Sequence, residues 1–223
     1  MSPGMPAHLL IGQMDKLSFM SEQQKHFEGE NLSGASIRNR DLSSATFTDC
    51  FLANANLSNT NLRASKWTNV QLFEADFSGS DLSEADFRFQ NLSYVNFSGC
   101  KLVNADLRNA DLCETNFSGA DLTGAKLSYD ESLEDELDDE DELDDEFSAS
   151  IVGPCFIGAN LSGADLSNGD FEAADFTGAN LERCNLTGAC LVKAIFQKAN
   201  LTGTDFTDAD LDGSTNPDGS IHP

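Results

Sequence analysis

The chain has 223 residues, 39% apolar residues and a formal net charge of −25 at neutral pH. This length suits one domain, or one domain with an insertion. Thirteen of the 38 acidic residues lie between Asp130 and Glu146, so the rest of the chain still has 25 acidic against 13 basic residues. Such a surface repels nucleic acid and anionic membranes and favours basic protein surfaces or cations. We therefore expect no direct nucleic-acid partner and no membrane partner.

The six cysteines form no CxxC pair and have no metal-ligand spacing. In a chain of this size they are read as reduced thiols. No run approaches the roughly 18 apolar residues that span a bilayer, and the N-terminus lacks the basic start and apolar core of a signal peptide. The sequence therefore predicts a soluble cytoplasmic protein.

The first segment, residues 1–26, contains no repeat. Leu10, Met14 and Leu17 follow helical spacing within it. We predict a cap that is partly helical and that covers the first part of the fold that follows.

From Phe27 to Leu127 a large apolar residue occurs at every fifth position without a break. Neither a strand nor an α-helix has this period. A small residue usually stands two positions before the large one, and Gly or Asn often stands two positions after it, where each accepts a turn conformation. The chain is therefore expected to bend every five residues around a central axis.

The aromatic residues predict how many quintets make one turn. Phe27, Phe47, Trp67 and Phe87 follow one another at intervals of four quintets, and a second column is offset from the first by two quintets. Four quintets per turn would place these columns on two opposed sides, with leucine on the other two. The predicted core stack is Phe47, Trp67, Phe77, Phe87, Phe97, Phe117, Phe156, Phe176 and Phe196.

The motif A(D/N)LXX, seen as GADLT and GANLE, resembles the pentapeptide-repeat proteins. The resemblance covers most of the chain and implies an all-β fold, the right-handed quadrilateral β-helix. With coils about 4.8 Å apart, about 8.5 coils would form a rod about 40 Å long. Arg40, Gln90 and Pro154 occupy positions meant for small inward residues, and there we expect a bulge or an outward-turned side chain.

An acidic interruption separates two parts of the repeat. The repeat stops at residues 129–147 and resumes at Ile151. The large positions Leu127 and Ile151 are 24 residues apart in place of the regular five, so the insertion adds 19 residues. Phe156 would then rejoin the side of Phe77, with the insertion as a loop on one continuous rod. The acidic residues of this predicted interaction loop are Asp130, Glu131, Glu134, Asp135, Glu136, Asp138, Asp139, Glu140, Asp141, Glu142, Asp144, Asp145 and Glu146.

Three interpretations of the acidic loop are open. It can be a disordered, solvated tract, or a docking arm for a basic protein surface. The docking arm would use apolar anchors, which are Leu133, Leu137, Leu143 and Phe147. Diffuse binding of divalent cations is the third interpretation, although no ligand spacing is defined.

The repeat is predicted to occupy residues 27–213, and residues 214–223 to form a turn-rich tail. The tail is similar to those of cyanobacterial members of the family. The C-terminal dimerising helix of the quinolone-resistance members is not evident, so we expect a monomer or a weak end-to-end dimer.

Nothing in the sequence predicts catalysis, a cofactor or a metal site. The three histidines, His8, His26 and His222, lie at or beyond the ends of the repeat, where they cannot pair with a nucleophile. The sequence favours a non-catalytic interaction or scaffold module that binds an unknown protein with a basic surface. The family resemblance implies an alternative, a mimic of duplex DNA that binds type II topoisomerase (gyrase) and modulates it.

Overall fold

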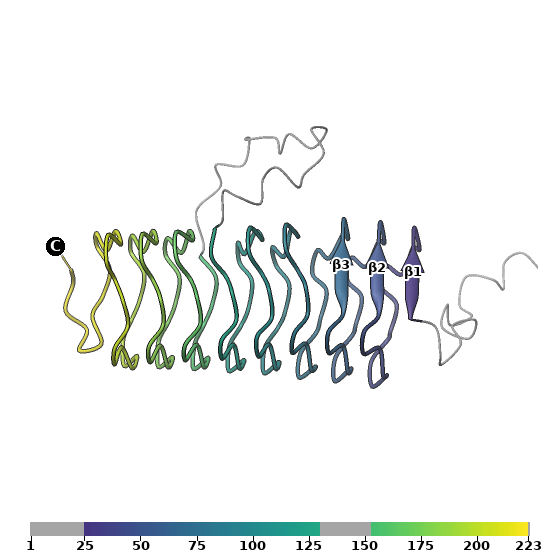
Figure 1. Cartoon of the computed structure of the whole chain (residues 1–223), viewed down its shortest axis with the longest axis horizontal. Helices are drawn as coiled ribbons and strands as arrows, with labels where there is room; N and C mark the ends of the chain where they lie inside the picture. Colours follow the sequence, from purple (N-terminus) through teal and green to yellow (C-terminus); the bar gives the residue numbers. More distant parts are fainter. Residues whose placement is uncertain (1–24, 130–152, 223) are drawn as a thin grey trace, which may run out of the picture.

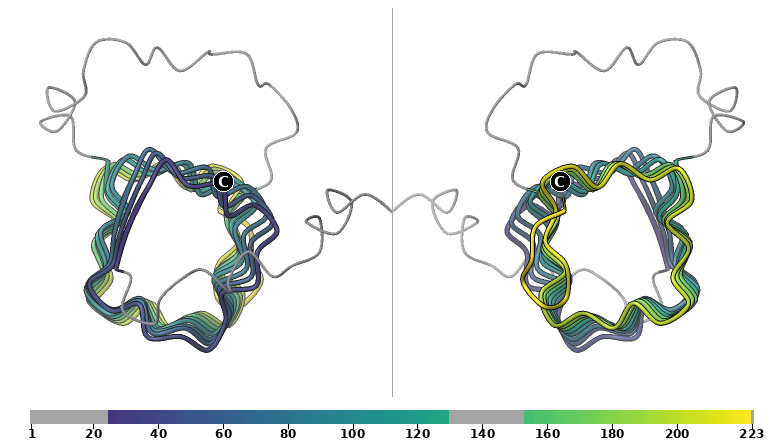
Figure 2. Two further views of the ribbon diagram at one scale, coloured as in Figure 1. Left: turned by 90° about the vertical axis from the view of Figure 1, so that its right-hand side faces the viewer. Right: turned by 90° about the vertical axis from the view of Figure 1, so that its left-hand side faces the viewer.

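The computed structural model describes residues 25–129 and 153–222, which wind into a rod of stacked four-sided coils (Figures 1 and 2). Three short strands, β1 (His26–Glu28), β2 (Thr46–Thr48) and β3 (Lys66–Thr68), pair in parallel, each with the strand four quintets further along. Isolated parallel bridges continue the same ladder. On this side of the rod the ladder joins nine residues: His26, Thr46, Lys66, Asp86, Asp106, Lys126, Asp165, Asn185 and Asp205. The predicted β-helix, with four quintets per turn, is confirmed.

Each side of the rod is named here by its inward residues. Side I contains Phe27, Phe47, Trp67, Phe87, Leu107, Leu127, Leu166, Leu186 and Phe206. Side II contains Leu32, Leu52, Leu72, Leu92, Leu112, Phe171, Leu191 and Leu211. Side III contains Ile37, Leu57, Phe77, Phe97, Phe117, Phe156, Phe176 and Phe196, and side IV contains Leu42, Leu62, Leu82, Leu102, Leu122, Leu161, Leu181 and Leu201.

One quintet shows why the chain turns every five residues. The Ser80 N–H donates to the Phe77 carbonyl at 3.0 Å, and Gly79 between them has a φ of 69°, as a turn with positive φ at its third residue requires. The Asp81 Oδ1 then accepts the Ser83 N–H at 3.1 Å. This last bond recurs around the rod and explains why Asp or Asn so often precedes the large residue: its side chain satisfies a backbone donor.

The aromatic columns occupy the two opposed sides, as predicted, but side II, where leucine was expected, also contains the buried Phe171. On side I the Phe47 and Trp67 rings stack with centroids 4.1 Å apart. On side III consecutive rings from Phe77 to Phe196 stack at about 5 Å, in line with the spacing of paired strands. The columns meet across the interior, where Trp67 and Phe77 contact edge to face at 5.4 Å. The residues of the predicted core stack therefore pack in the interior of the rod.

The repeat continues in register across the acidic insertion. Three bridges join the two parts of the rod: Asn116 with Cys155, Asp121 with Asn160 and Lys126 with Asp165. The partners in each bridge are 39 residues apart in the chain, which is one coil of 20 residues plus the predicted 19 inserted residues. The register of the coils before and after the insertion therefore confirms its predicted length. The acidic residues themselves, Asp130 to Glu146, and Ile151 lie outside the described residues.

The expected distortions at two unusual inward positions are not found. Gln90 is 6% exposed, its Oε1 accepts the Val70 N–H at 3.0 Å, and its Nε2 donates to the Arg88 carbonyl at 3.3 Å. Its own N–H keeps the regular turn bond to Phe87 at 3.2 Å, so an amide is accommodated because both of its ends are bonded. Pro154 is also buried, and its carbonyl accepts the Asp175 N–H. The prediction of a bulge or an outward-turned side chain was therefore wrong at Gln90 and Pro154. Arg40, the third of these positions, is half-buried.

The ladder extends beyond the predicted boundaries at both ends. His26 belongs to β1 and Lys25 is also described, while residues 1–24 of the predicted cap lie outside the described residues. Thr215, assigned to the tail, pairs in parallel with Ile195 and in antiparallel with Ile221. The His222 N–H donates to the Ser214 carbonyl at 2.7 Å, so residues 214–222 fold back against the last coil.

Candidate protein-interaction face

The described residues bring no catalytic constellation together. His26 lies beside Thr46, with its Nδ1 2.9 Å from the hydroxyl, and His222 lies at the opposite end of the rod. Across residues 25–129 and 153–222, no group of three or more His, Cys, Asp or Glu side chains could hold a metal ion.

The cysteines follow the inward and outward pattern of the repeat. All six lie in the described part of the chain and none is joined in a disulfide; Cys50, Cys100 and Cys184 are buried and Cys113 is exposed. Burial raises the pKa of the Cys100 and Cys184 thiols to about 12. These buried thiols are therefore protonated packing residues at neutral pH.

Side II carries negative charge along the middle of the rod. In this middle part its outward acidic residues are Glu74, Asp111, Glu114, Asp170 and Glu172. No lysine or arginine points outward from its described quintets between Asn31 and Glu172, and the next cation, Lys193, pairs with Glu172 at 3.1 Å. Glu172 is therefore paired, whereas Glu74, Asp111, Glu114 and Asp170 form none of the described ion pairs, and such carboxylates attract positively charged groups.

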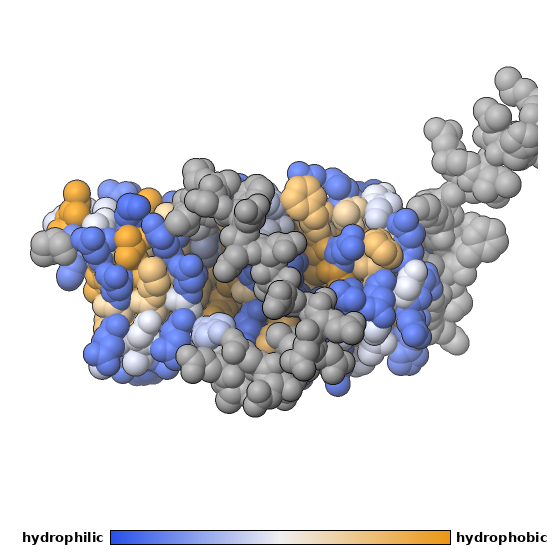
Figure 3. Space-filling view, turned by 90° about the horizontal axis from the view of Figure 1, so that it is seen from above, coloured by the Kyte–Doolittle hydropathy of each residue, from blue (hydrophilic) through white to orange (hydrophobic). Residues whose placement is uncertain are grey.

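Exposed aromatic side chains lie on the same side. Phe51, Phe73 and Tyr94 are 41%, 50% and 39% exposed. Figure 3 shows apolar side chains gathered among hydrophilic ones on the face seen from above. Sequence reasoning missed these residues because it followed only inward positions. The available signal was a large apolar residue at an outward position of a quintet.

The described residues that flank the acidic segment in the chain lie beside this side. Its flanking described residues, Tyr129 and Gly153, line a cavity of about 430 Å³ together with Leu112, Cys113 and Phe171. Carboxylates of Asp111, Glu114, Asp170 and Glu172 also border it. Tyr129 and Gly153, the described residues on either side of residues 130–152, therefore lie among the acidic residues of side II.

Side I has the opposite character in the middle of the rod. Asp86 and Asp106 are ladder neighbours, and two like charges in that position repel each other. Arg88 binds both carboxylate oxygens of Asp86 at 2.9 Å, and Arg108 binds Asp106 at 2.9 and 2.7 Å. Burial acts to raise the pKa of Asp106, but Arg108 and Lys126 hold it below the ordinary value.

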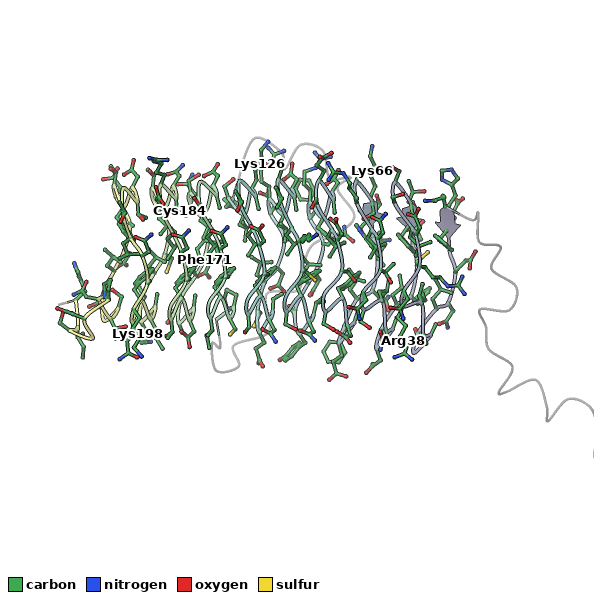
Figure 4. All side chains as sticks on the ribbon, turned by 90° about the horizontal axis from the view of Figure 1, so that it is seen from below. Arg38, Lys66, Lys126, Phe171, Cys184 and Lys198 are labelled. Atoms are coloured by element: carbon green, nitrogen blue, oxygen red, sulfur yellow. The ribbon has the colours of Figure 1, made fainter. Side chains whose placement is uncertain are left out.

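Lys66 and Lys126 flank the two Asp–Arg pairs. Figure 4 shows them along one edge of the rod, with Arg38 and Lys198 of side III along the other. Positive charge is thus concentrated on sides other than side II.

On side IV the outward column is neutral toward the C-terminus, where Asn180 and Asn200 each donate an amide N–H to the previous Asn at 3.0 and 2.8 Å.

Comparison with known proteins identifies the repeat. The family profile described as pentapeptide repeats matches in eight copies, between residues 31 and 128 and again between residues 155 and 215. The chain belongs to the pentapeptide-repeat family. A comparison with curated proteins gave no match.

Several solved structures are similar to the chain. HetL, a pentapeptide-repeat protein involved in heterocyst differentiation regulation in the cyanobacterium Nostoc, is 28% identical over 89% of this chain and 90% of its own, with a TM-score of 0.34. QnrB1, a plasmid-mediated fluoroquinolone resistance protein, is 21% identical over 83% and 89%, with a TM-score of 0.35. Rfr23 from the cyanobacterium Cyanothece is 20% identical over 88% and 91%, with a TM-score of 0.18.

Within the described part of this pentapeptide-repeat chain, no helix is both long and apolar enough to cross a membrane.

Proposed function

We propose that the chain is a non-catalytic interaction module that binds a protein with a basic surface. Binding uses side II of the β-helix together with the acidic segment Asp130–Glu146. The observation that carries this proposal is the run of uncompensated carboxylates on side II, from Glu74 to Asp170. Carboxylates fixed on a rigid rod attract a basic partner and orient it as it approaches.

A pull-down from cell extract, followed by identification of the bound proteins, tests this function. The matched variants each remove four charges. One carries Glu74→Gln, Asp111→Asn, Glu114→Gln and Asp170→Asn on side II, and the other Asp41→Asn, Asp81→Asn, Asp121→Asn and Glu182→Gln on side IV. A basic protein retained by the wild type and the side IV variant, but lost from the side II variant, supports the proposal. Equal recovery by all three proteins contradicts the role of side II.

The alternative function is mimicry of DNA toward a type II topoisomerase, supported by the net charge of −25 on a rod. Lys66, Arg88, Arg108 and Lys126 interrupt the negative surface of side I, which disfavours a mimic that presents this side. A gyrase supercoiling assay separates the two functions. Mimicry requires a change in supercoiling at micromolar protein, and the interaction module requires none.

We further propose that the chain is a cytoplasmic monomer or weak end-to-end dimer. The six cysteines without a disulfide support a reducing compartment. Leu201, Phe206 and Leu211 of the last coil are only partly buried, which supports contact between ends at high concentration. Sedimentation velocity over a range of concentrations measures this association.

A further inference from the structure

Two exposed aromatic rings form a pair on side II. The Phe73 and Tyr94 rings lie with centroids 5.2 Å apart and planes inclined by 58°. Both are well exposed, and they come from adjacent coils. At the position of Phe73 the neighbouring coils carry Ala53 and Ser93, so the repeat itself does not require an aromatic residue there.

Tyr94 stands at a corner of the repeat where the backbone turns with positive φ. It has a φ of 64°, in the left-handed region that a bulky side chain rarely adopts. The same corner carries Gly34 and Asn54 in earlier coils, and those residues adopt this conformation readily. Glu74 and Glu114 adopt the same conformation, with φ values of 56° and 51°, so this corner of the repeat accepts large side chains and presents them to solvent.

Carboxylates flank the aromatic pair along the rod. Glu74 and Glu114 occupy the same corner as Tyr94 in the coils before and after it, and both are exposed. One coil spans roughly 4.8 Å, so the backbone positions of Glu74 and Glu114 lie about 10 Å apart, with that of Tyr94 between them. A hydrogen bond to Glu114 and the charge of that residue raise the pKa of Tyr94.

We propose that Phe73, Tyr94, Glu74 and Glu114 form a binding site for an arginine side chain of a partner protein. The inference rests on the proposed function, because it specifies how side II recognises a basic partner. An aromatic face attracts a cation within about 6 Å of its centroid. The guanidinium group is planar, so it stacks on a ring while its N–H groups donate to a carboxylate. Exposed tilted rings between two carboxylates offer both interactions.

The test measures binding of a fluorescein-labelled peptide, (Arg-Ser)6, to the full chain by fluorescence anisotropy. A salt concentration of about 300 mM suppresses the general attraction between exposed charges. The site variant is Phe73→Ser with Tyr94→Gly, which introduces residues that the same columns already carry. The matched control, Ile157→Ser with Ile195→Thr, removes two exposed apolar side chains from side III. Circular dichroism checks that both variants are folded.

The site variant is expected to raise the Kd at least about fivefold, and the control less than about twofold. The peptide (Lys-Ser)6 is expected to bind the wild type about threefold more weakly than (Arg-Ser)6, because an ammonium group cannot stack and bind bidentately. A photo-crosslinking version of the arginine peptide should label residues around Phe73 and Tyr94.

Two results overturn the proposal in distinguishable ways. If (Arg-Ser)6 binds but the site variant leaves its Kd unchanged, the arginine site is wrong and the proposed function stands. If neither peptide binds the wild type even at low salt, the proposed function fails together with the site.

Discussion

The Phe117 and Phe156 rings stack in parallel, with centroids 5.1 Å apart and planes within 3°, although the whole acidic segment lies between them in the chain. Their neighbours on the same side, Phe97 and Phe117, stack at 5.3 Å with only the regular four quintets between them. The core of the β-helix is therefore continuous past the point where the acidic segment joins it.

Deletion of residues 130–148 should leave a folded rod. The deletion removes the whole excess and joins Tyr129 to Ala149, so the sequence ASIVG supplies the missing quintet of side II with a small residue, Ile151 and a corner glycine in place. We expect a melting temperature no lower than that of the full chain, measured by circular dichroism, because stability in a solenoid is a sum of contacts between neighbouring coils.

A matched deletion of residues 130–146 leaves two surplus residues at the same corner. This variant should have a lower melting temperature than the variant that lacks residues 130–148, because only the longer deletion restores the register of the repeat. If the longer deletion loses cooperative melting, the coil is not continuous in the way that the Phe117–Phe156 pair indicates.

Gly169 and Phe171 should be energetically coupled. A Cβ built on Gly169 would lie 2.5 Å from the Phe171 ring and 3.2 Å from the Leu127 carbonyl. Gly169→Ala should destabilise the protein by about 1–3 kcal/mol through overpacking. Phe171→Leu, which restores the side chain used elsewhere on side II, should recover much of that loss in the double variant. Denaturant unfolding of the four proteins measures the coupling, and additive effects would contradict it.

Acidification should destabilise the rod below the ordinary pKa of aspartate. The Thr207 hydroxyl and N–H donate to Asp205 at 2.6 and 3.0 Å and lower its pKa below 3.8. The folded state therefore holds this proton less tightly than the unfolded state. Its stabilising contribution is present above pH about 4 and is lost as the pH falls through the folded pKa.

Melting temperature measured from pH 7 to pH 2 checks this expectation. Asp205→Asn keeps an acceptor for Thr207 but does not titrate, so its curve should be flatter at acid pH than that of the wild type. An identical acid dependence in both proteins would show that Asp205 contributes nothing.

Iodoacetamide should distinguish the cysteines at pH 8. Cys113 is exposed, whereas Cys100 and Cys184 are buried with pKa values of about 12. Since the thiolate is the reacting species, mass spectrometry should find Cys113 labelled first, and Cys100 and Cys184 labelled only after unfolding. Labelling of Cys100 in the folded protein would contradict its position in the core.

The sequence predicts what depends on the repeat and misses what depends on single contacts. The period of five and the recurrence of aromatic residues every four quintets predicted the coil, the opposed columns and the position of Phe156, because identical quintets pack identically. Burial of Gln90 was not predictable in this way, since it depends on bonds to Val70 and Arg88 in the folded chain. The Phe73–Tyr94 contact likewise joins outward positions of different coils, which the inward pattern does not describe.

The decisive measurement is the affinity of (Arg-Ser)6 for the side II and side IV variants, compared at physiological salt. Each variant removes four negative charges, so the two proteins have the same net charge and differ only in the location of the remaining carboxylates. We predict a Kd at least about fivefold higher for the side II variant and little change for the side IV variant. Equal affinities would show that net charge alone attracts the peptide, and would contradict side II as the binding face.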